Sequence, residues 1–200
     1  MTPHLRLEGM PDAVIDGGRL GSTISVRAPD VTISGLVVRG SGLSLIDKDS
    51  GIFLDVGADR AVIEHDDLEG NLISVYLDGP HDVIVRGNRI RGLQTLRRSE
   101  RGPAISLWNT PGSQILDNDI RYGRDGVFVV TSHDDTVRNN VFRDLRFAVH
   151  FMYSDDSVVD KNVSVANDIG YVMMYSARAA GDRQCFGSRP RPRTIAQLRQ

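Results

Sequence analysis

The sequence predicts an all-β protein: a right-handed parallel β-helix (a solenoid) of about six to seven coils, each 22 residues long. Three observations support this fold. Asn118, Asn140 and Asn162 recur at a spacing of 22 residues. Apolar residues around them alternate with polar or small ones, and no segment keeps the period of a helix. A unit this short cannot bury its own apolar face, so the units are expected to stack in parallel, with the right-handed crossover that parallel strands favour.

The repeat defines four apolar columns from about residue 14 to residue 176, once two insertions of eight residues are allowed. Each column is expected to stack inside one continuous core. The Asn-type positions are expected to form a turn ladder, because asparagine tolerates left-handed backbone angles and stacked side chains can bond from coil to coil. The columns are Ile33, Ile63, Val85, Ile115, Val137 and Val159; Val38, Leu68, Ile90, Ile120, Phe142 and Ser164; Phe53, Val75, Ile105, Val127, Val149 and Tyr171; and Asp55, Leu77, Leu107, Val129, Phe151 and Met173.

Two regions of different character are expected, a β-helix domain at 1–176 and a basic tail at 177–200. The domain carries 18 basic and 25 acidic residues, whereas the tail holds six arginines and one aspartate. Composition changes at the boundary from alternating Val, Ile and Phe to Arg and Pro. The tail is expected to be disordered, and the alternative is a basic arm for an anionic partner.

Composition excludes several classes of protein. Hydrophobic residues make up 40% and charged residues 25% of the chain, which suits a globular fold. No stretch approaches the roughly 20 apolar residues of a membrane span, so an integral membrane protein is excluded. The formal charge of −2 argues against nucleic-acid binding. The single cysteine, Cys185, excludes an internal disulfide, and the first residues contain no apolar segment of a secretory signal.

The two insertions, 43–50 and 93–102, fall at the same corner of the coil, on coils separated by one plain coil. One carries acidic residues and the other basic ones. A flap closed by ion pairs between them is expected, and a lip that docks a partner is the alternative. The charged residues are Asp47 and Asp49 in the first insertion, and Arg97, Arg98 and Arg101 in the second.

Two more columns alternate with the third and fourth apolar columns and therefore point outward. A soluble rod is expected to be polar at such positions. In the C-terminal coils they are apolar, so this face is predicted to dock a protein or a ligand. The alternative is that a loop, the tail or further chain covers it. The columns are Leu54, Tyr76, Ser106, Phe128, His150 and Val172, and Val56, Asp78, Trp108, Val130, Met152 and Met174. The predicted partner-binding residues are Trp108, Phe128, Val130, His150, Met152 and Met174.

Three residues of this face have side chains that bind soft metals. Met152 and Met174 stand one coil apart in the same column, and His150 lies two residues from Met152. Thioether and imidazole groups together suit Cu(I) better than Zn²⁺, Mg²⁺ or Ca²⁺. These three residues are therefore candidate copper ligands. The alternative is that the methionines only fill space.

Histidine–aspartate pairs occur at 65–67, 81–82 and 133–135. Such pairs can perform acid–base catalysis. Each one stands beside an expected strand start, however, where aspartate and histidine commonly form turns. They are therefore interpreted as structural.

The C-terminal coils carry motifs that are similar to a known family. The runs Phe-Ala-Val-His-Phe-Met-Tyr-Ser at 147–154 and Gly-Tyr-Val-Met-Met-Tyr-Ser at 170–176 are the specific ones, and the similarity extends over about residues 10 to 176. This pattern resembles NosD, the periplasmic β-helix proteins required for maturing the copper centres of nitrous oxide reductase. The resemblance implies a periplasmic, non-catalytic accessory role beside an ABC transporter, with the reductase and a copper chaperone as partners. The short repeat and the missing signal suggest a truncated or frame-altered copy.

The competing function is a β-helix enzyme, a lyase, hydrolase or epimerase, that acts on acidic polysaccharide. Such enzymes need clustered carboxylates and a base. Asp78 is the one carboxylate in the outward columns, and the epimerase-like string Tyr-Gly-Arg-Asp-Gly at 122–126 lacks the His-Asp that follows it in those enzymes. These features favour the accessory role.

Overall fold

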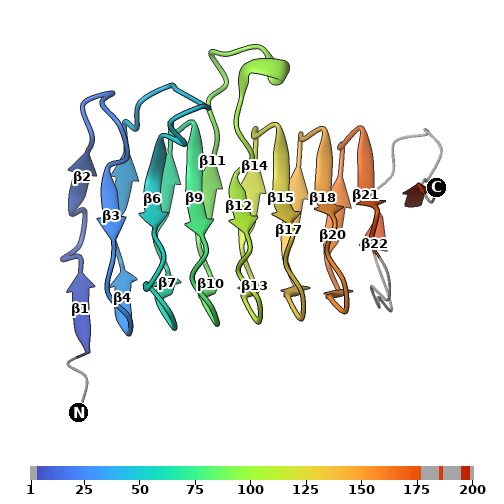
Figure 1. Cartoon of the computed structure of the whole chain (residues 1–200). Helices are drawn as coiled ribbons and strands as arrows, with labels where there is room; N and C mark the ends of the chain where they lie inside the picture. The colour runs from blue at the N-terminus through green and yellow to red at the C-terminus, as the bar shows by residue number, and fades with distance from the viewer. Residues whose placement is uncertain (1–3, 177–184, 187–194, 199–200) are drawn as a thin grey trace.

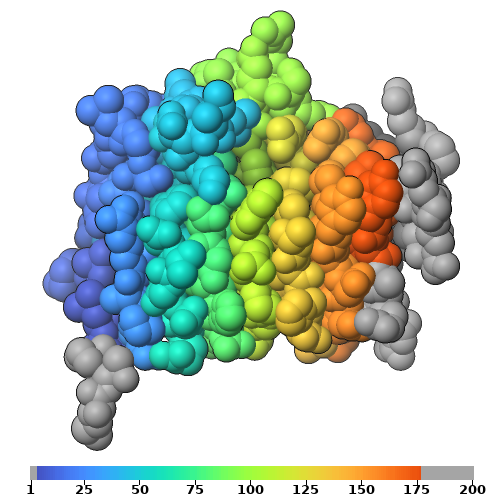
Figure 2. All heavy atoms as spheres, viewed as in Figure 1, coloured from blue at the N-terminus to red at the C-terminus, as the bar shows by residue number. Residues whose placement is uncertain are grey.

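The computed structural model describes residues 4–176, 185–186 and 195–198. Short strands wind into a solenoid in which each coil follows the previous one along the axis (Figure 1). The space-filling view shows the coils as successive bands from the N-terminal to the C-terminal end (Figure 2). The predicted all-β, right-handed parallel β-helix is confirmed. Helix in the described residues is limited to the 3₁₀ turn η1 (Arg98–Glu100) in the second insertion.

Three parallel sheets run along the rod, and every strand except those at the sheet ends pairs with its equivalents one coil before and after it. Sheet A contains β1 (Leu5–Glu8), β4 (Val31–Ser34), β7 (Val62–Glu64), β10 (Ile84–Arg86), β13 (Gln114–Leu116), β16 (Thr136–Arg138) and β19 (Val158–Asp160). Sheet B contains β2 (Val14–Asp16), β5 (Val37–Arg39), β8 (Asp67–Glu69), β11 (Arg89–Arg91), β14 (Asp119–Arg121), β17 (Val141–Arg143), β20 (Val163–Val165) and β22 (Cys185–Phe186). Sheet C contains β3 (Ile24–Val26), β6 (Ser50–Leu54), β9 (Ile73–Asp78), β12 (Ile105–Trp108), β15 (Asp125–Val130), β18 (Phe147–Met152), β21 (Ile169–Met174) and β23 (Ile195–Leu198).

The main core is one continuous cluster enclosed by the three sheets, and a smaller buried cluster is formed by Leu72, Ile73, Tyr76 and Leu93. The first two predicted columns are confirmed: each member pairs with the next one along the rod, from Ile33 to Val159 in sheet A and from Val38 to Ser164 in sheet B. The sheet A column is at most 2% exposed throughout. Burying these apolar side chains supplies the main stabilisation of the stack.

The predicted third and fourth columns are wrong at their first members. Ile52, not Phe53, pairs with Val75, and Leu54, not Asp55, pairs with Leu77. Leu54 is therefore fully buried, and Phe53 takes the outward position beside Tyr76. The cause is the turn after β6: seven residues, 55–61, separate Leu54 from Val62, whereas six residues, 78–83, separate the equivalent Leu77 and Ile84.

The predicted ladder of Asn-type residues is confirmed. Each side-chain Oδ1 accepts a hydrogen bond from the backbone N–H of the residue one coil earlier, and the amide nitrogens donate to core-strand carbonyls. The ladder therefore satisfies buried polar groups that would otherwise be costly. Its members are Asp66, Asn88, Asn118, Asn140 and Asn162, with donor–acceptor distances of 2.8–3.0 Å between backbone nitrogens and Oδ1.

The left-handed backbone expected at these asparagines lies one residue earlier instead. His65, Asp117, Asn139 and Lys161 have φ between 53° and 58°, and Gly87 has φ of 65°. At Gly87 a Cβ would approach the His65 ring to 2.8 Å, so a larger residue there would have to displace that ring. The turn and the ladder thus use adjacent residues.

The predicted ion-paired flap between the two insertions is wrong. Their charged side chains bond within their own insertion or to other coils, as short polar loops commonly do. The observed partners are Ser44 for Asp47 and Asp49, Glu100 for Arg97, Asp168 for Arg98, and the carbonyls of Gln94, Leu96 and Tyr122 for Arg101.

Within the predicted tail, 177–200, the structure describes β22 and β23 alone. They extend sheets B and C beyond β20 and β21. The expectation of disorder for the rest of the tail lies outside the described residues. In the described part of the chain, no helix has the length and apolar character needed to span a bilayer.

Candidate functional site on the outer face of sheet C

The predicted outward columns lie on sheet C in the expected register from β12 onward. Parallel pairing aligns Ser106, Phe128, His150 and Val172 in one column. The adjacent column contains Trp108, Val130, Met152 and Met174. These eight residues form what we call the sheet C face.

The sheet C face is more closed than the sequence suggested. Trp108 is 49% exposed, but Val130 and His150 are only 8% and 6% exposed. Phe128, Met152 and Met174 are partly buried. Side chains in a stacked column shield one another from both sides, since neighbouring strands lie only about 4.8 Å apart. The face therefore combines one open aromatic residue with a shielded imidazole.

His150 is held by contacts with four side chains. Its Nε2 lies 3.3 Å from the Sδ of Met174, and its Nδ1 lies 3.7 Å from Oδ2 of Asp125. The ring centroids of Phe128 and Phe147 lie 4.8 and 5.2 Å from that of His150, in tilted and edge-on arrangements. One nitrogen thus faces a thioether and the other faces a carboxylate.

Asp125 is fully buried and forms the electrostatic centre of the site. Arg146 forms a bidentate ion pair with Asp125, in which Nε donates to Oδ1 at 2.8 Å and Nη2 donates to Oδ2 at 2.6 Å. The guanidinium of Arg146 also lies over the ring of Phe147 at 4.2 Å. Burial raises the pKa of Asp125, but His150 and Arg146 outweigh burial and hold that pKa below its usual range. The carboxylate beside His150 is therefore ionised.

Sequence reasoning missed Asp125 because strict alternation would point it inward. Pairing in β15 and β18 passes from Asp125 opposite Phe147 to Val127 opposite Val149, and Gly126 and Ala148 are skipped. A Cβ on Gly126 would lie 2.5 Å from the Phe142 ring, so glycine fits the core side and Asp125 turns outward. The small residues at 126, 148 and 170 are the signal that could have revealed this break.

The donor set fits a soft monovalent ion. His150 and Met174 present nitrogen and sulfur donors close enough to contact one ion, and a carboxylate stands behind the imidazole, as behind many metal-binding histidines. In addition, Nδ1 of His150 is buried without a hydrogen bond. The described residues hold no group of three or more His, Cys, Asp or Glu suited to a metal.

The three predicted copper ligands are brought together unequally. His150 contacts Met174 across one coil. Met152 is the strand partner of Met174 and lies on the same face. Trp108 stands in that column too, two strands before Met152. The roles of all six predicted partner-binding residues stay predictions.

A stacked tyrosine pair borders the face and was also missed. Tyr153 and Tyr175 follow Met152 and Met174 directly, and their rings stack at 4.9 Å and 8°. Both have positive φ, 51° and 52°, which is unusual for an aromatic residue, and both are about half exposed. The Met-Tyr-Ser repeat in both coils was the available signal.

The histidine–aspartate pairs form turns, as interpreted. His65, Asp82 and Asp134 all have positive φ. Of the remaining carboxylates, Asp67 pairs with Arg89, whereas Asp66 and Asp135 are buried in ladders, where burial raises the pKa of each to about 7. These groups serve the coil structure.

An open pocket of about 390 Å³ lies on the outer side of sheet B rather than on sheet C. It is lined by both acidic and basic residues, and Arg39 pairs with Asp16 at 2.9 Å inside it. Its lining residues are Asp16, Arg19, Arg39, Gly40, Glu69, Gly70, Arg91, Gly92 and Gln94.

The winding and the three parallel sheets define the class: the molecule is a right-handed parallel β-helix protein. The periplasmic alginate epimerase AlgG has a similar structure, with a TM-score of 0.71 over 90% of this chain and 47% of the epimerase, at 16% identity. An alginate lyase from a Paenibacillus species gives a TM-score of 0.52 over 93% of this chain and 78% of the lyase, at 15% identity. At such identities the likeness shows the fold alone.

Sequence comparison finds a similarity to one family. Residues 92–182 match the family described as "Periplasmic copper-binding protein (NosD)". Two curated relatives, each named "Probable ABC transporter binding protein NosD", are 36% identical over 61% of this chain (Stutzerimonas stutzeri) and 35% identical over 62% (Pseudomonas aeruginosa). The chain is thus similar to NosD proteins, and it spans 28% of the length of each curated relative.

Proposed function

We propose that this chain is a non-catalytic periplasmic accessory protein that handles copper for the maturation of nitrous oxide reductase, alongside an ABC transporter. The observation that carries the proposal is the approach of His150 Nε2 to Met174 Sδ, 3.3 Å, on an otherwise apolar face. The names of the family, a periplasmic copper-binding protein, and of the relatives, ABC transporter binding proteins, support it.

The two nitrogens of His150 face chemically different groups, a carboxylate at Nδ1 and a thioether at Nε2. The ionised Asp125 favours a proton on Nδ1, which leaves the lone pair of Nε2 directed at the sulfur of Met174. Two electron-pair donors that face each other are stabilised by a cation between them. Imidazole and thioether suit Cu(I) best among the common cellular cations. His150 and Met174 would hold that ion, and Met152 is the third candidate.

Other residues of the site support this role. Arg146 fixes Asp125, and Asp125 with Phe128 and Phe147 fixes the His150 ring, so the imidazole is oriented before any ion arrives. The buried Asp125 is already bound by Arg146, which leaves it unsuited to act as a catalytic base.

A Cu(I) titration against a chromophoric chelator, without oxygen, tests the metal site. The wild-type protein is expected to retain one Cu(I), and His150→Ala and Met174→Leu are each expected to weaken retention about tenfold or more, because each removes a ligand. Met152→Leu measures whether a third ligand takes part.

Two methionine variants provide matched controls. Met173 is the neighbour of Met174 that packs against the core, and Met10 is 77% exposed outside the repeat coils of the site. Met173→Leu and Met10→Leu are expected to retain copper like the wild type. No retained copper, or equal retention in wild type, His150→Ala and Met174→Leu, removes the metal site and leaves packing of His150 against Asp125 and Met174 as the explanation.

The docking role is tested separately with Trp108→Ala. Trp108, Phe128 and Val130 form the apolar end of the face, where an ABC transporter subunit, the reductase or a copper chaperone would dock. Truncating the half-exposed Trp108 is expected to weaken binding to purified reductase or chaperone by ~1 kcal/mol or more, because buried aromatic residues dominate interface energies. Leu20→Ala, at a residue 80% exposed elsewhere, is the control. Equal binding by both variants contradicts the docking role.

A further inference from the structure

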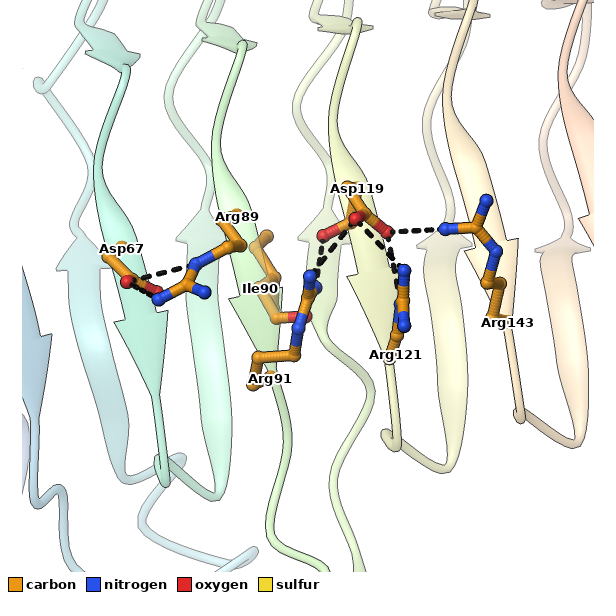
Figure 3. Close-up of polar contacts among 7 residues, drawn as sticks. All are labelled: Asp67, Arg89, Ile90, Arg91, Asp119, Arg121 and Arg143. Atoms are coloured by element: carbon orange, nitrogen blue, oxygen red, sulfur yellow. Dashed lines mark hydrogen bonds and ion pairs between the residues drawn. The ribbon is translucent and has the colours of Figure 1, made fainter.

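Three arginines on successive coils of sheet B share one carboxylate. Arg91, Arg121 and Arg143 occupy the same outward column of β11, β14 and β17. Figure 3 shows their guanidinium groups converging on Asp119 from three strands. The three arginines do not bind this carboxylate equally closely.

Arg91 is the arginine that binds Asp119 best. Its Nη2 lies 3.0 Å from Oδ2 of Asp119, and its Nη1 donates to the carbonyls of Ile90 and Asp119. Arg121 and Arg143 approach the same carboxylate only to 3.4 Å. A guanidinium has five N–H donors, so most donors of these two arginines are left for another acceptor.

The neighbouring coils show what balanced pairing looks like. Arg39, in the same column, pairs one-to-one with Asp16 at 2.9 Å, and Arg89 pairs with Asp67 in the adjacent column (Figure 3). Beyond Arg143 the column continues with Val165. Positive charge therefore accumulates at Arg121 and Arg143, where no second carboxylate follows in the column.

These arginines are accessible to a ligand. The side chains of Arg121 and Arg143 are 32% and 34% exposed, and Asp119 is 36% exposed. The coil spacing keeps adjacent column positions about 4.8 Å apart, so two guanidinium groups can contact one tetrahedral anion. Arginine forks match phosphate and carboxylate oxygens in pairs, and Asp119 already shows that the cluster accepts an oxyanion.

We propose that Arg121 and Arg143, with Arg91 beside them, form a binding site for a divalent oxyanion, either free phosphate or sulfate or such a group carried on a larger molecule. The site lies on sheet B and is separate from the sheet C face. Asp119 both positions the guanidinium groups and competes with the ligand for their charge.

The test is a calorimetric titration of the full chain with inorganic phosphate and with sulfate, at ionic strength held constant with sodium chloride. Saturable binding is expected for the wild type. Arg143→Gln and Arg121→Gln are each expected to weaken it about tenfold, since each removes charge-assisted hydrogen bonds. Arg39→Gln, in the same column but paired one-to-one with Asp16, is the matched control and is expected to bind like the wild type.

Asp119→Asn is expected to change the affinity for phosphate in the opposite direction from the arginine variants. Removing the competing carboxylate is expected to strengthen phosphate binding several-fold. A cluster that serves structure alone would instead lose thermal stability with no gain in binding, and that result overturns the proposal, as does equal or absent binding in all variants. Phenyl phosphate distinguishes the sources: affinity equal to that of inorganic phosphate supports a carried group, and weaker affinity supports the free ion.

Discussion

The outer faces of sheets B and C are built on the same coils and carry opposite chemistry. On sheet B, charged side chains pair with one another along the rod, and most are partly exposed. On sheet C, aromatic rings and thioethers surround one shielded imidazole, and the one carboxylate beside it is fully buried. The coil thus sets the spacing of side chains on both faces, whereas burial decides how much each polar contact contributes to stability.

Both faces depend on the core they share, so a core charge is expected to have the largest effect. Val137→Asp places a carboxylate in a fully buried column, and the free energy of unfolding is expected to fall by about 4 kcal/mol or more, because the charge has no partner. Urea unfolding measures it. Arg138→Gln, the exposed neighbour that pairs with Asp160, is expected to cost less than about 1 kcal/mol. Comparable losses for the two variants would show that the coils do not share a core.

The same substitution on the two faces tests the role of burial directly. Asp125→Asn leaves Arg146 without its buried partner and is expected to cost about 3 kcal/mol, whereas Asp119→Asn, at a partly exposed position, is expected to cost about 1 kcal/mol or less. Because the pKa of Asp125 is lowered in the folded state, its contribution is present above the unfolded pKa near 3.8 and is lost as pH falls through the folded value. Urea unfolding at pH 7 and pH 3 measures both points. Equal losses on the two faces would break the comparison.

A buried carboxylate in the turn between β7 and β8 is expected to act in the opposite direction. The pKa of Asp66 is raised to about 7 by burial, so the folded state holds a proton that the unfolded state has released. The stability it contributes is complete below about pH 4 and is lost as pH rises through 7. Asp66→Asn removes the charge and supplies an amide for the carbonyl of Ile33, as Asn88 does for Ile63. It is expected to gain about 2 kcal/mol at pH 8.

Thermal unfolding between pH 4 and pH 8 checks this expectation. Asn118→Asp, at the equivalent ladder position, is the reverse variant and should acquire the pH dependence that Asp66→Asn loses. Identical pH profiles for the wild type and Asp66→Asn would rule out Asp66 as the titrating group.

The fold could be predicted because the length of one coil appears in the sequence as a 22-residue repeat. The asparagine period fixed the register, and the stacked columns in sheets A and B followed from it. The prediction failed where one extra residue entered the turn after β6, because a turn can absorb a residue without leaving a mark in the hydrophobic pattern. The left-handed positions were misplaced by one residue because polar residues occupy both positions in most coils, whereas a glycine marks the left-handed position at Gly87.

The site was predictable in position but not in its contacts. Alternation placed His150, Met152 and Met174 on one face, and the register was correct. It could not indicate that Asp125 also faces outward, since that depends on the break at Gly126, nor that Arg146 would bury the carboxylate. Side-chain contacts across coils depend on the three-dimensional path of the chain.

The corner between sheets B and C shows how a molecule of this kind can change its length. Both insertions leave the stack at that corner, and the strands on either side keep their pairing. A duplication or loss of one whole 22-residue coil would likewise preserve every column, whereas a shift of one residue within a strand would exchange the inside for the outside. Mutations that change the chain length are therefore tolerated when they add or remove a whole coil or when they lengthen a corner loop. Those that add an odd number of residues within a strand are not tolerated.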